Sequence, residues 1–410
     1  MGLMDMTTSG PVALEPASFE DGAERQVELM TRAQAVADVA AAHAEEVDRN
    51  AVFPTAAIEA ARRNGLFALL VPKQFGGPGS SVSEVADVCY TLGQACSSTA
   101  MIVAMHHAAL SCIVRHHHDS AWHGALLRRV AAENLLLASS TTEGNAGGNV
   151  RSSAAPLVYD GDTITLDRAA TVMSYGAQAD GIVTTARRDS EGAASDQALI
   201  VFMKEDYTLT PTGGWETLGM RGTCSSGFAL KAKGSTAQIL PVGYDKIHPQ
   251  SMVPVSHLVW SSTWTGIAAA AVGRAQAFVR TAARRAGGQM PPGAGQHTRA
   301  VAALRSLRGT IASALSSYER MESDRVTLGA IETQAALNLL KVEVSEQAVA
   351  TIMTAMRACG LAGYRTDGEF AVGRHLRDIL SAPIMVHNDR IMTNIAATAL
   401  MSGVPASLRD

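Results

Sequence analysis

The chain has 410 residues, 47% of them hydrophobic, and carries a formal net charge of -4 at pH 7. This length and apolar content support a large buried core and predict two or three structural units. The charge balance, without any cluster of Lys and Arg, excludes the basic surface on which nucleic-acid binding depends.

Cysteine usage and the longest apolar runs narrow the class of protein further. The five cysteines include no CxxC pair, which predicts neither a zinc site nor disulfides and indicates reduced thiols in a cytoplasmic protein. No basic segment followed by an apolar stretch opens the chain, so we expect no signal peptide. We also expect no membrane span, because the longest run of small residues, 266–273, is far shorter than the ~20 apolar residues that a bilayer requires.

The first part of the chain has a helical pattern. After a mixed N-terminal arm, Ala-rich segments of helical length follow one another, interrupted by the Pro and Gly residues of VPKQFGGPGSS at 71–81. The expected helices are 26–49, 55–64, 82–96 and 98–115. They predict an N-terminal all-helical domain over 21–134.

The pattern changes at Leu135 to short alternating apolar runs, such as ITLD and QALIVFM, separated by Gly, Asp and Ser turns. This change predicts a middle β domain over 135–248. Helical patterns then return and predict a C-terminal four-helix bundle over 249–404. The expected bundle helices are 256–285, 296–323, 333–359 and 376–402. The predicted fold is therefore mainly α with a central β domain.

Two polar clusters interrupt the apolar strand pattern between Leu135 and Asp180. The clusters are Thr141, Thr142, Gly144, Gly147 and Gly148, and then Ser174, Tyr175 and Gly176. Glycines let backbone N–H groups approach a ligand, and hydroxyls supply further donors and acceptors. The two clusters can converge on one flat polar ligand, although Gly and Ser between strands also mark ordinary turns.

Histidines are frequent near the end of the first helical region. They are His106, His107, His116, His117, His118 and His123. The run HHHDSAWH lacks the i, i+4 pair of a helical zinc site and has no cysteine nearby, so we expect no metal and interpret these residues as a polar helix end. Met101 and Met105 have helical spacing, which favours a role in filling the core.

Seven segments carry a family resemblance by their order along the chain. They are NGLFALLVPKQFGGPGSS at 64–81, SSTAMIVAMHHA at 97–108, TTEGNAGGN at 141–149, MSYGAQAD at 173–180, LGMRGTCSSGF at 218–228, and CGLAGY at 359–364 followed by GRHLRDI at 373–379. In this order they resemble landmarks of the acyl-CoA dehydrogenase superfamily of flavoproteins, over about 53–400. The resemblance implies a barrel-like middle domain between the helical domains and an FAD cofactor beside the C-terminal bundle.

The resemblance also implies roles for particular residues. Thr142 and the backbone from Thr141 through Gly147 and Gly148 would contact the flavin, and the Ser174 hydroxyl would reach its N5 edge. A donor there stabilises the negative charge of the reduced flavin. Arg284 or Arg285, with Gln296, would bind the adenosine and pyrophosphate across a subunit boundary, which implies a homodimer or homotetramer. Further cofactor contacts are implied at Gly360, Gly363 and Asn388.

The catalytic carboxylate of the family is missing from both of its usual positions. Thioester dehydrogenation needs a base for the α-proton, and most members place a glutamate where this chain has Val386, in IMVHNDRI. A subset uses a position that matches Ser256. His387 and Asp389 are the candidate substitutes, although both can instead make loop hydrogen bonds, with Asp389 paired to Arg390. His257, just after Ser256, either faces the same cavity or is a solvated first-turn residue.

Three hypotheses about function follow from the resemblance. The first is an FAD-dependent oxidoreductase that dehydrogenates an acyl-CoA or acyl-carrier substrate and passes electrons to an electron-transfer flavoprotein. The second is a flavin-dependent monooxygenase of the same fold, supplied by a flavin reductase, in which His387 and Ser174 replace the glutamate. The third is a non-catalytic flavin-binding homologue. Function depends on the site more than on the fold, so the fold does not choose among them.

Overall fold

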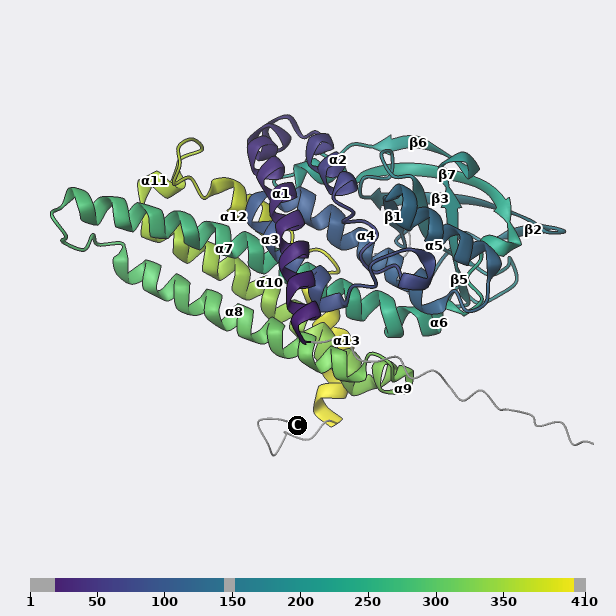
Figure 1. Cartoon of the computed structure of the whole chain (residues 1–410). Helices are drawn as coiled ribbons and strands as arrows, with labels where there is room; N and C mark the ends of the chain where they lie inside the picture. Colours follow the sequence, from purple (N-terminus) through teal and green to yellow (C-terminus); the bar gives the residue numbers. More distant parts are fainter. Residues whose placement is uncertain (1–18, 144–151, 402–410) are drawn as a thin grey trace, which may run out of the picture.

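The computed structural model describes residues 19–143 and 152–401, and it arranges them as helices, then strands, then helices (Figure 1). The predicted order of secondary structure is confirmed. The N-terminal helices are α1 (Phe19–Asn50), α2 (Thr55–Arg63), α3 (Val82–Ala95), α4 (Ser97–His116) and α5 (Ala121–Glu133). A capping box starts α3, in which the Ser81 hydroxyl accepts from the Glu84 N–H and the Glu84 carboxylate accepts from the Ser81 N–H.

Helix α4 is the apolar centre of this first region. Within the described ranges it is the one helix long and apolar enough to cross a membrane, and 89% of its apolar window is buried inside the protein. It packs against α3, the long helix α7 (Val253–Arg285) and the first strand. Its apolar composition is therefore accounted for by packing on several sides.

The strand region forms two sheets. Its strands are β1 (Leu137–Ser140), β2 (Val158–Asp160), β3 (Thr163–Met173), β4 (Gly181–Arg187), β5 (Gln197–Met203), β6 (Tyr207–Gly213) and β7 (Ser226–Ser235). One sheet has the order β1-β4-β5 and the other β2-β3-β7-β6. Strand β1 pairs with β4 in parallel, and the other pairs are antiparallel. All of β5 is buried, whereas β3 alternates between buried and exposed residues, as a strand with one solvated face does.

The C-terminal helices form a bundle around α7. After α6 (Tyr244–Ile247) and a π-helical turn at His248–Met252, they are α7, α8 (Ala294–Met321), α9 (Arg325–Gly329), α10 (Ile331–Cys359), α11 (Leu361–Tyr364), α12 (Gly373–Ile379) and α13 (Asn388–Met401). Helix α7 packs against α3 and α4 on one side and against α8 and α10 on the other. It therefore joins the two helical regions and passes beside the strands (Figure 1).

The helix predicted over 376–402 is wrong as a single element. Helix α12 ends at Ile379 and α13 begins only at Asn388. Pro383 has no N–H to give a helix, and its carbonyl accepts a hydrogen bond from the Asn388 N–H (2.9 Å). Val386 has a φ of 50°, a left-handed conformation that is unusual for a β-branched residue. The segment 380–387 therefore turns back on itself instead of continuing a helix.

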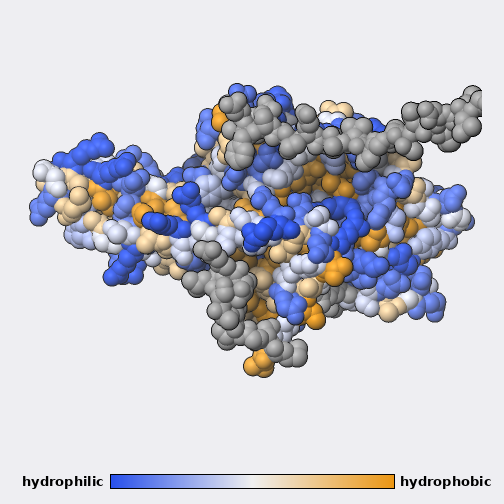
Figure 2. Space-filling view, turned by 60° about the horizontal axis from the view of Figure 1, so that its bottom comes forward, coloured by the Kyte–Doolittle hydropathy of each residue, from blue (hydrophilic) through white to orange (hydrophobic). Residues whose placement is uncertain are grey.

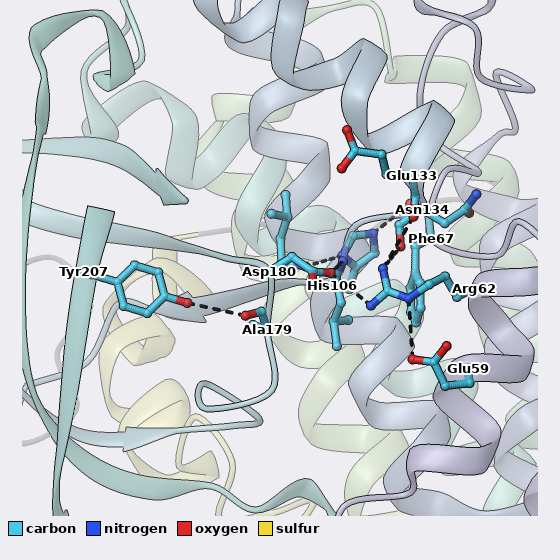
Figure 3. A network of polar contacts seen from close by, with 11 residues as sticks. Glu59, Arg62, Phe67, His106, Glu133, Asn134, Ala179, Asp180 and Tyr207 are labelled. Atoms are coloured by element: carbon cyan, nitrogen blue, oxygen red, sulfur yellow. Dashed lines mark hydrogen bonds and ion pairs between the residues drawn. The ribbon is translucent and has the colours of Figure 1, made fainter. Parts of the chain in front are cut away.

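A polar network joins the N-terminal helices to the strand region (Figure 3). Asp180, just before β4, pairs with Arg62 on α2 (3.1 Å). His106 on α4 accepts from the Leu137 N–H at Nδ1 (3.0 Å), so its Nε2–H donates to the Phe67 carbonyl (2.8 Å). Burial lowers the pKa of His106 to about 4, which keeps the ring neutral. The start of β1 is thereby held against α4.

Helices α3 and α7 approach closely at a pair of glycines. A Cβ at Gly266 would lie 2.3 Å from the Tyr90 carbonyl oxygen and 3.1 Å from the Gly93 Cα. Gly266→Ala should therefore force the helices apart and lower the free energy of unfolding by about 1–3 kcal/mol, measured by urea denaturation. Gly273→Ala is the matched control, because a Cβ at this exposed position of the same helix meets nothing within 4 Å. It should stabilise by up to about 1 kcal/mol, and equal effects of the two substitutions would contradict the packing argument.

Candidate active site

A cavity of about 630 Å³ lies where the strand region meets α4, the start of α7 and the segment 380–387. This volume falls within the usual range of small-molecule pockets, about 300–1,000 Å³. Its lining is mainly apolar and includes five methionines, Met101, Met105, Met220, Met252 and Met385. Met101 and Met105 thus contribute to a cavity wall as well as to the core.

Apolar side chains also remain exposed around this cavity. Of the residues that line it, Leu218 and Ile384 are 61% and 68% exposed, and Val386 is 41% exposed. The space-filling view shows apolar patches near the middle of the molecule, while hydrophilic residues predominate at its right-hand end (Figure 2). Exposed large apolar groups beside a cavity are typical of a surface that receives a ligand or another chain.

The structure brings together Thr141, Thr142 and Ser174, as the two predicted polar clusters required. All three line the cavity, Thr141 and Thr142 after β1 and Ser174 after β3. The Ser174 hydroxyl is hydrogen-bonded to that of Ser225 (2.7 Å), which is in turn bonded to the Thr223 hydroxyl (2.7 Å). We call these five residues the hydroxyl wall. Gly144, Gly147 and Gly148 lie outside the described residues.

A buried ion pair supports the hydroxyl wall from behind. Glu143 follows Thr142 directly, and one of its oxygens lies 2.9 Å from the Arg168 guanidinium on β3, with the two side chains only 6% and 1% exposed. Glu143 also accepts from the Ser153 hydroxyl (2.7 Å) and the Ala154 N–H (2.6 Å). Arg168 donates to the Thr185 carbonyl. The chain around Thr141 and Thr142 is thus held at both ends, by β1 and by Glu143.

The chemistry of this lining fits a flavin ring. An isoalloxazine has hydrogen-bonding nitrogens and oxygens along one edge and an apolar dimethylbenzene end. The hydroxyl wall offers donors and acceptors to the polar edge, and the methionines and Trp260 offer apolar contact. Tyr244 Oη and Ser256 Oγ also belong to residues of this lining, and both atoms are buried without a hydrogen-bond partner among the described residues. Such orphaned groups indicate a ligand that completes their hydrogen bonding.

The predicted substitute bases do not line the cavity. His387 and Asp389 are 58% and 92% exposed, and they lie beside each other, with Nδ1 of His387 3.8 Å from a carboxylate oxygen of Asp389. Val386, by contrast, belongs to the cavity wall. No Asp or Glu occurs among the described residues that form this wall.

Asn388 is buried in a network behind the same segment. Its amide oxygen accepts from the Lys341 ammonium (2.6 Å), and its amide nitrogen donates to Glu346 (2.7 Å) and to the Ser345 hydroxyl (3.0 Å). Lys341, itself buried, also donates to the carbonyl of Val386 (3.3 Å). Lys341 and Asn388 together fix the left-handed turn that places Val386 in the cavity wall.

The remaining predicted cofactor ligands lie away from this cavity. Arg284 is exposed at the end of α7, and Gln296 is half-buried at the start of α8, near the outer tip of the hairpin that these helices form (Figure 1). Gly360 has a φ of 57° and ends α10, and Gly363 is buried in α11. Their contact with a cofactor across a subunit boundary stays a prediction.

His257 faces the cavity and is not a solvated first-turn residue. The side chain is 3% exposed and lines the wall, next to Ser256 on the same turn of α7. Its Nδ1–H donates to the Leu337 carbonyl on α10 (3.0 Å). Burial, with a smaller contribution from the Lys341 charge, lowers the pKa of His257 to about 4. The His257 imidazole is therefore neutral near pH 7.

The interpretation of the other histidines as a polar helix end is wrong for those that the core encloses. His106, His107, His116 and His123 are each at most 1% exposed. His107 and His116 bond to the Leu66 carbonyl (2.8 Å) and to the Ser251 hydroxyl (2.9 Å). Among the residues for which positions are described, no three His, Cys, Asp or Glu side chains are grouped as metal ligands would be.

Comparison with known families gives two matches along the chain. The acyl-CoA dehydrogenase N-terminal domain matches residues 23–133, and the acyl-CoA dehydrogenase C-terminal domain matches residues 253–401. Together they span more than half of the sequence. Among curated proteins, cyclohex-1-ene-1-carbonyl-CoA dehydrogenase of Syntrophus aciditrophicus is 23% identical over 253 residues. That match covers 61% of each protein's length.

Solved structures share the fold over nearly the whole chain. FMN-bound TdsC from Paenibacillus sp. A11-2, a dibenzothiophene monooxygenase also solved with FMN and indole, has a TM-score of 0.78 at 19% identity, covering 93% of this chain and 100% of that one. A nitrososynthase from Micromonospora carbonacea var. africana has a TM-score of 0.76 at 21% identity, covering 93% and 96%. These similarities establish the shared fold.

Proposed function

The chain belongs to the acyl-CoA dehydrogenase superfamily of flavoproteins, and from that premise we propose that it is a flavin-dependent monooxygenase acting on an uncharged, largely apolar substrate. The observation that carries this proposal is the absence of any carboxylate among the described cavity residues. Thioester dehydrogenation needs a base for the α-proton, whereas oxygen insertion does not. The exposed positions of His387 and Asp389 support the same choice.

The substrate class is argued from the same lining. Arg377 is the one Arg or Lys among the described lining residues, and its guanidinium already pairs with Asp48 and donates to the Leu218 carbonyl (2.9 Å). The phosphates of a CoA thioester would therefore find no free cation in this part of the cavity. Methionine side chains adapt to irregular apolar ligands, which suits a substrate without a charged carrier.

The roles of the protein groups follow from their positions. Bound reduced flavin would supply the two electrons with which one atom of O₂ enters the substrate and the other leaves as water. Thr141, Thr142 and Ser174 would hold the polar edge of the ring through their hydroxyls, and Trp260 and Met385 would limit the access of water. Removing a positioned donor of this kind typically slows an enzyme by about 10²-fold or more.

We propose FAD as the flavin, with Arg284 and Gln296 of one subunit binding the adenosine of another in a homodimer or homotetramer. The exposed position of Arg284 at the end of α7 suits such a contact. Reduced flavin would come from a separate flavin reductase. Mass analysis of the released cofactor distinguishes FAD from FMN, and light scattering of the loaded protein gives the number of subunits.

Two measurements test the proposed activity. Anaerobic addition of short, branched, long and aromatic acyl-CoA thioesters should leave the flavin absorbance near ~450 nm unchanged, because no positioned base removes the α-proton. With a flavin reductase, reduced nicotinamide and ¹⁸O₂, the product from indole should contain ¹⁸O. Indole is chosen because a solved structure of this fold contains it together with FMN.

Acyl-CoA dehydrogenation remains the second candidate, because the curated relative is a dehydrogenase. Bleaching of the flavin by any thioester would replace our proposal with this one and would require a base that the described wall does not contain. A protein that purifies without flavin and takes none up would contradict both activities and favour a homologue without catalysis.

A further inference from the structure

His257 presents one unused hydrogen-bond acceptor to a mainly apolar cavity. Its Nδ1–H is engaged with the Leu337 carbonyl (3.0 Å), so the neutral ring carries its lone pair on Nε2. That nitrogen has no partner among the described residues, on a side chain that lines the cavity. An imidazole held in one tautomer by a backbone carbonyl is a directed acceptor.

Ser256, the preceding residue of α7, brings a second unused group to the lining of the same cavity. Its hydroxyl is buried, with the side chain 2% exposed, and has no hydrogen-bond partner within the described part of the chain. Among the other hydroxyls of α7, those of Ser262 and Thr263 donate to the carbonyls one turn earlier (2.9 and 3.0 Å), whereas that of Ser261 is also buried without a partner among the described residues but does not line the cavity. A buried polar group left unpaired destabilises the fold, so an unpaired hydroxyl at a cavity wall indicates a ligand.

The surroundings of His257 disfavour protonation of its ring, so Nε2 remains a hydrogen-bond acceptor. Lys341, one turn after Leu337 on α10, is a buried cation held by Asn388 and by the Val386 carbonyl. Its ammonium lies 5.7 Å from the centre of the Trp264 ring on α7. A second positive charge on His257 would repel this ammonium inside the protein, which disfavours protonation of the ring.

We propose that His257 and Ser256 recognise the substrate, and that this substrate is an otherwise apolar molecule with one O–H or N–H group. The hydrogen of that group is accepted by His257 Nε2, and the Ser256 hydroxyl donates to the same oxygen or to a neighbouring acceptor. This inference rests on the proposed function and names the substrate class of that site. An analogue without the hydrogen leaves Nε2 without this bond, so the site favours the ligand that carries the hydrogen.

Binding of two matched probes tests the proposal without any turnover. 2-Naphthol and 2-methoxynaphthalene differ only in whether the oxygen carries hydrogen or methyl, and their dissociation constants are measured by equilibrium dialysis against the oxidised, flavin-loaded protein. The naphthol should bind about threefold to tenfold more tightly, the effect of one neutral hydrogen bond. Reduced flavin and its reductase are absent, so failure of the oxygen chemistry does not affect the result.

Substitutions at His257 and Ser256 test whether these residues bind the probes. His257 should cause the preference for 2-naphthol over 2-methoxynaphthalene. His257→Leu should abolish it, and His257→Gln, whose amide oxygen accepts hydrogen bonds, should retain part of it. Ser256→Ala should weaken the binding of both probes at least twofold with little change in volume, because the oxygen of either probe can accept from its hydroxyl. His257→Gln decides the origin of the preference if His257→Leu does not fold. His43→Leu, at an exposed position on α1, should match the wild type. Equal preference in wild type and the His257 variants, unchanged affinity of both probes in Ser256→Ala, or no binding of either probe, would overturn the proposal.

Discussion

Lowering the pH from 7 to 5 should remove several kcal/mol from the free energy of unfolding. The cause is a set of histidines that the fold buries in the neutral state, and whose pKa values burial lowers: His106, His107, His116, His123, His257 and His375. Hydrogen bonding agrees with this state, since His375 Nε2 lies 3.0 Å from the Arg274 guanidinium, which can only donate.

The direction of the effect follows from which state binds more protons. In the unfolded chain a histidine titrates near 6.5, whereas folded His106 has a pKa of about 4. Between these two pKa values the unfolded state binds protons that the folded state does not bind. The stability that is present above pH 6.5 is therefore lost as the pH falls toward 4. At pH 5 one such group contributes at most about 2 kcal/mol of destabilisation. Asp378, whose pKa burial raises, acts in the opposite direction, but it is one carboxyl among these imidazoles.

Urea unfolding at pH 7, 6, 5.5 and 5 measures the effect. Near pH 5.5 the slope of stability against pH should correspond to about one proton taken up per buried histidine on unfolding. His43→Gln, which alters an exposed ring, should leave the slope unchanged. A stability that stays constant from pH 7 to pH 5 would mean that these histidines titrate normally in the folded protein.

Arg168→Leu should lower the free energy of unfolding by about 3–5 kcal/mol, because it leaves the Glu143 carboxylate buried without its cationic partner. The substitution should also weaken flavin binding. Glu143 fixes the chain next to Thr141 and Thr142, so the purified variant should retain less flavin per chain. Urea denaturation gives the stability, and the ratio of absorbance near ~450 nm to that near ~280 nm gives the flavin content.

The neighbouring residue provides the control for Arg168. Asp167 points outward from the same strand and forms an exposed pair with Lys231 (3.5 Å), so Asp167→Ala should change stability by no more than about 0.5 kcal/mol. The double variant Arg168→Leu with Glu143→Gln should recover part of the loss, since it removes the unpaired charge. A change below about 1 kcal/mol in Arg168→Leu alone would show that the ion pair does not hold this part of the fold.

Local patterns predicted most of the helices and several strands because these elements depend on nearby residues. The expected helix at 82–96 corresponds to α3, whose Ser81 and Glu84 form its cap, and the run QALIVFM is β5 itself. The break between α12 and α13 was missed. Pro383 is a local signal for this break, but the left-handed turn that follows at Val386 is held by Lys341, more than 40 residues away in sequence. A local pattern contains no such contact.

The candidate site could be predicted only in part, for the same reason. Thr141, Thr142 and Ser174 belong to strand ends, where polar clusters in the sequence already indicated a ligand. The role of His257 could not be read from its neighbours, because its burial and tautomer are set by Leu337 on another helix. His106 likewise bonds to Phe67 and Leu137, 39 and 31 residues away. Distant partners made these polar residues part of the core.

The two kinds of cavity residue come from separate parts of the chain, and this separation bears on how the protein can be re-engineered. The hydroxyl wall belongs to the ends of strands and is backed by Glu143 and Arg168. Ser256, His257 and Trp260 lie on α7, and Ile384 and Met385 lie in a turn that Lys341 holds in place. A mutational library confined to the second set would vary ligand shape while leaving the strand ends intact. A search for variants that accept new substrates can therefore begin with substitutions at a few positions of α7 and of this turn.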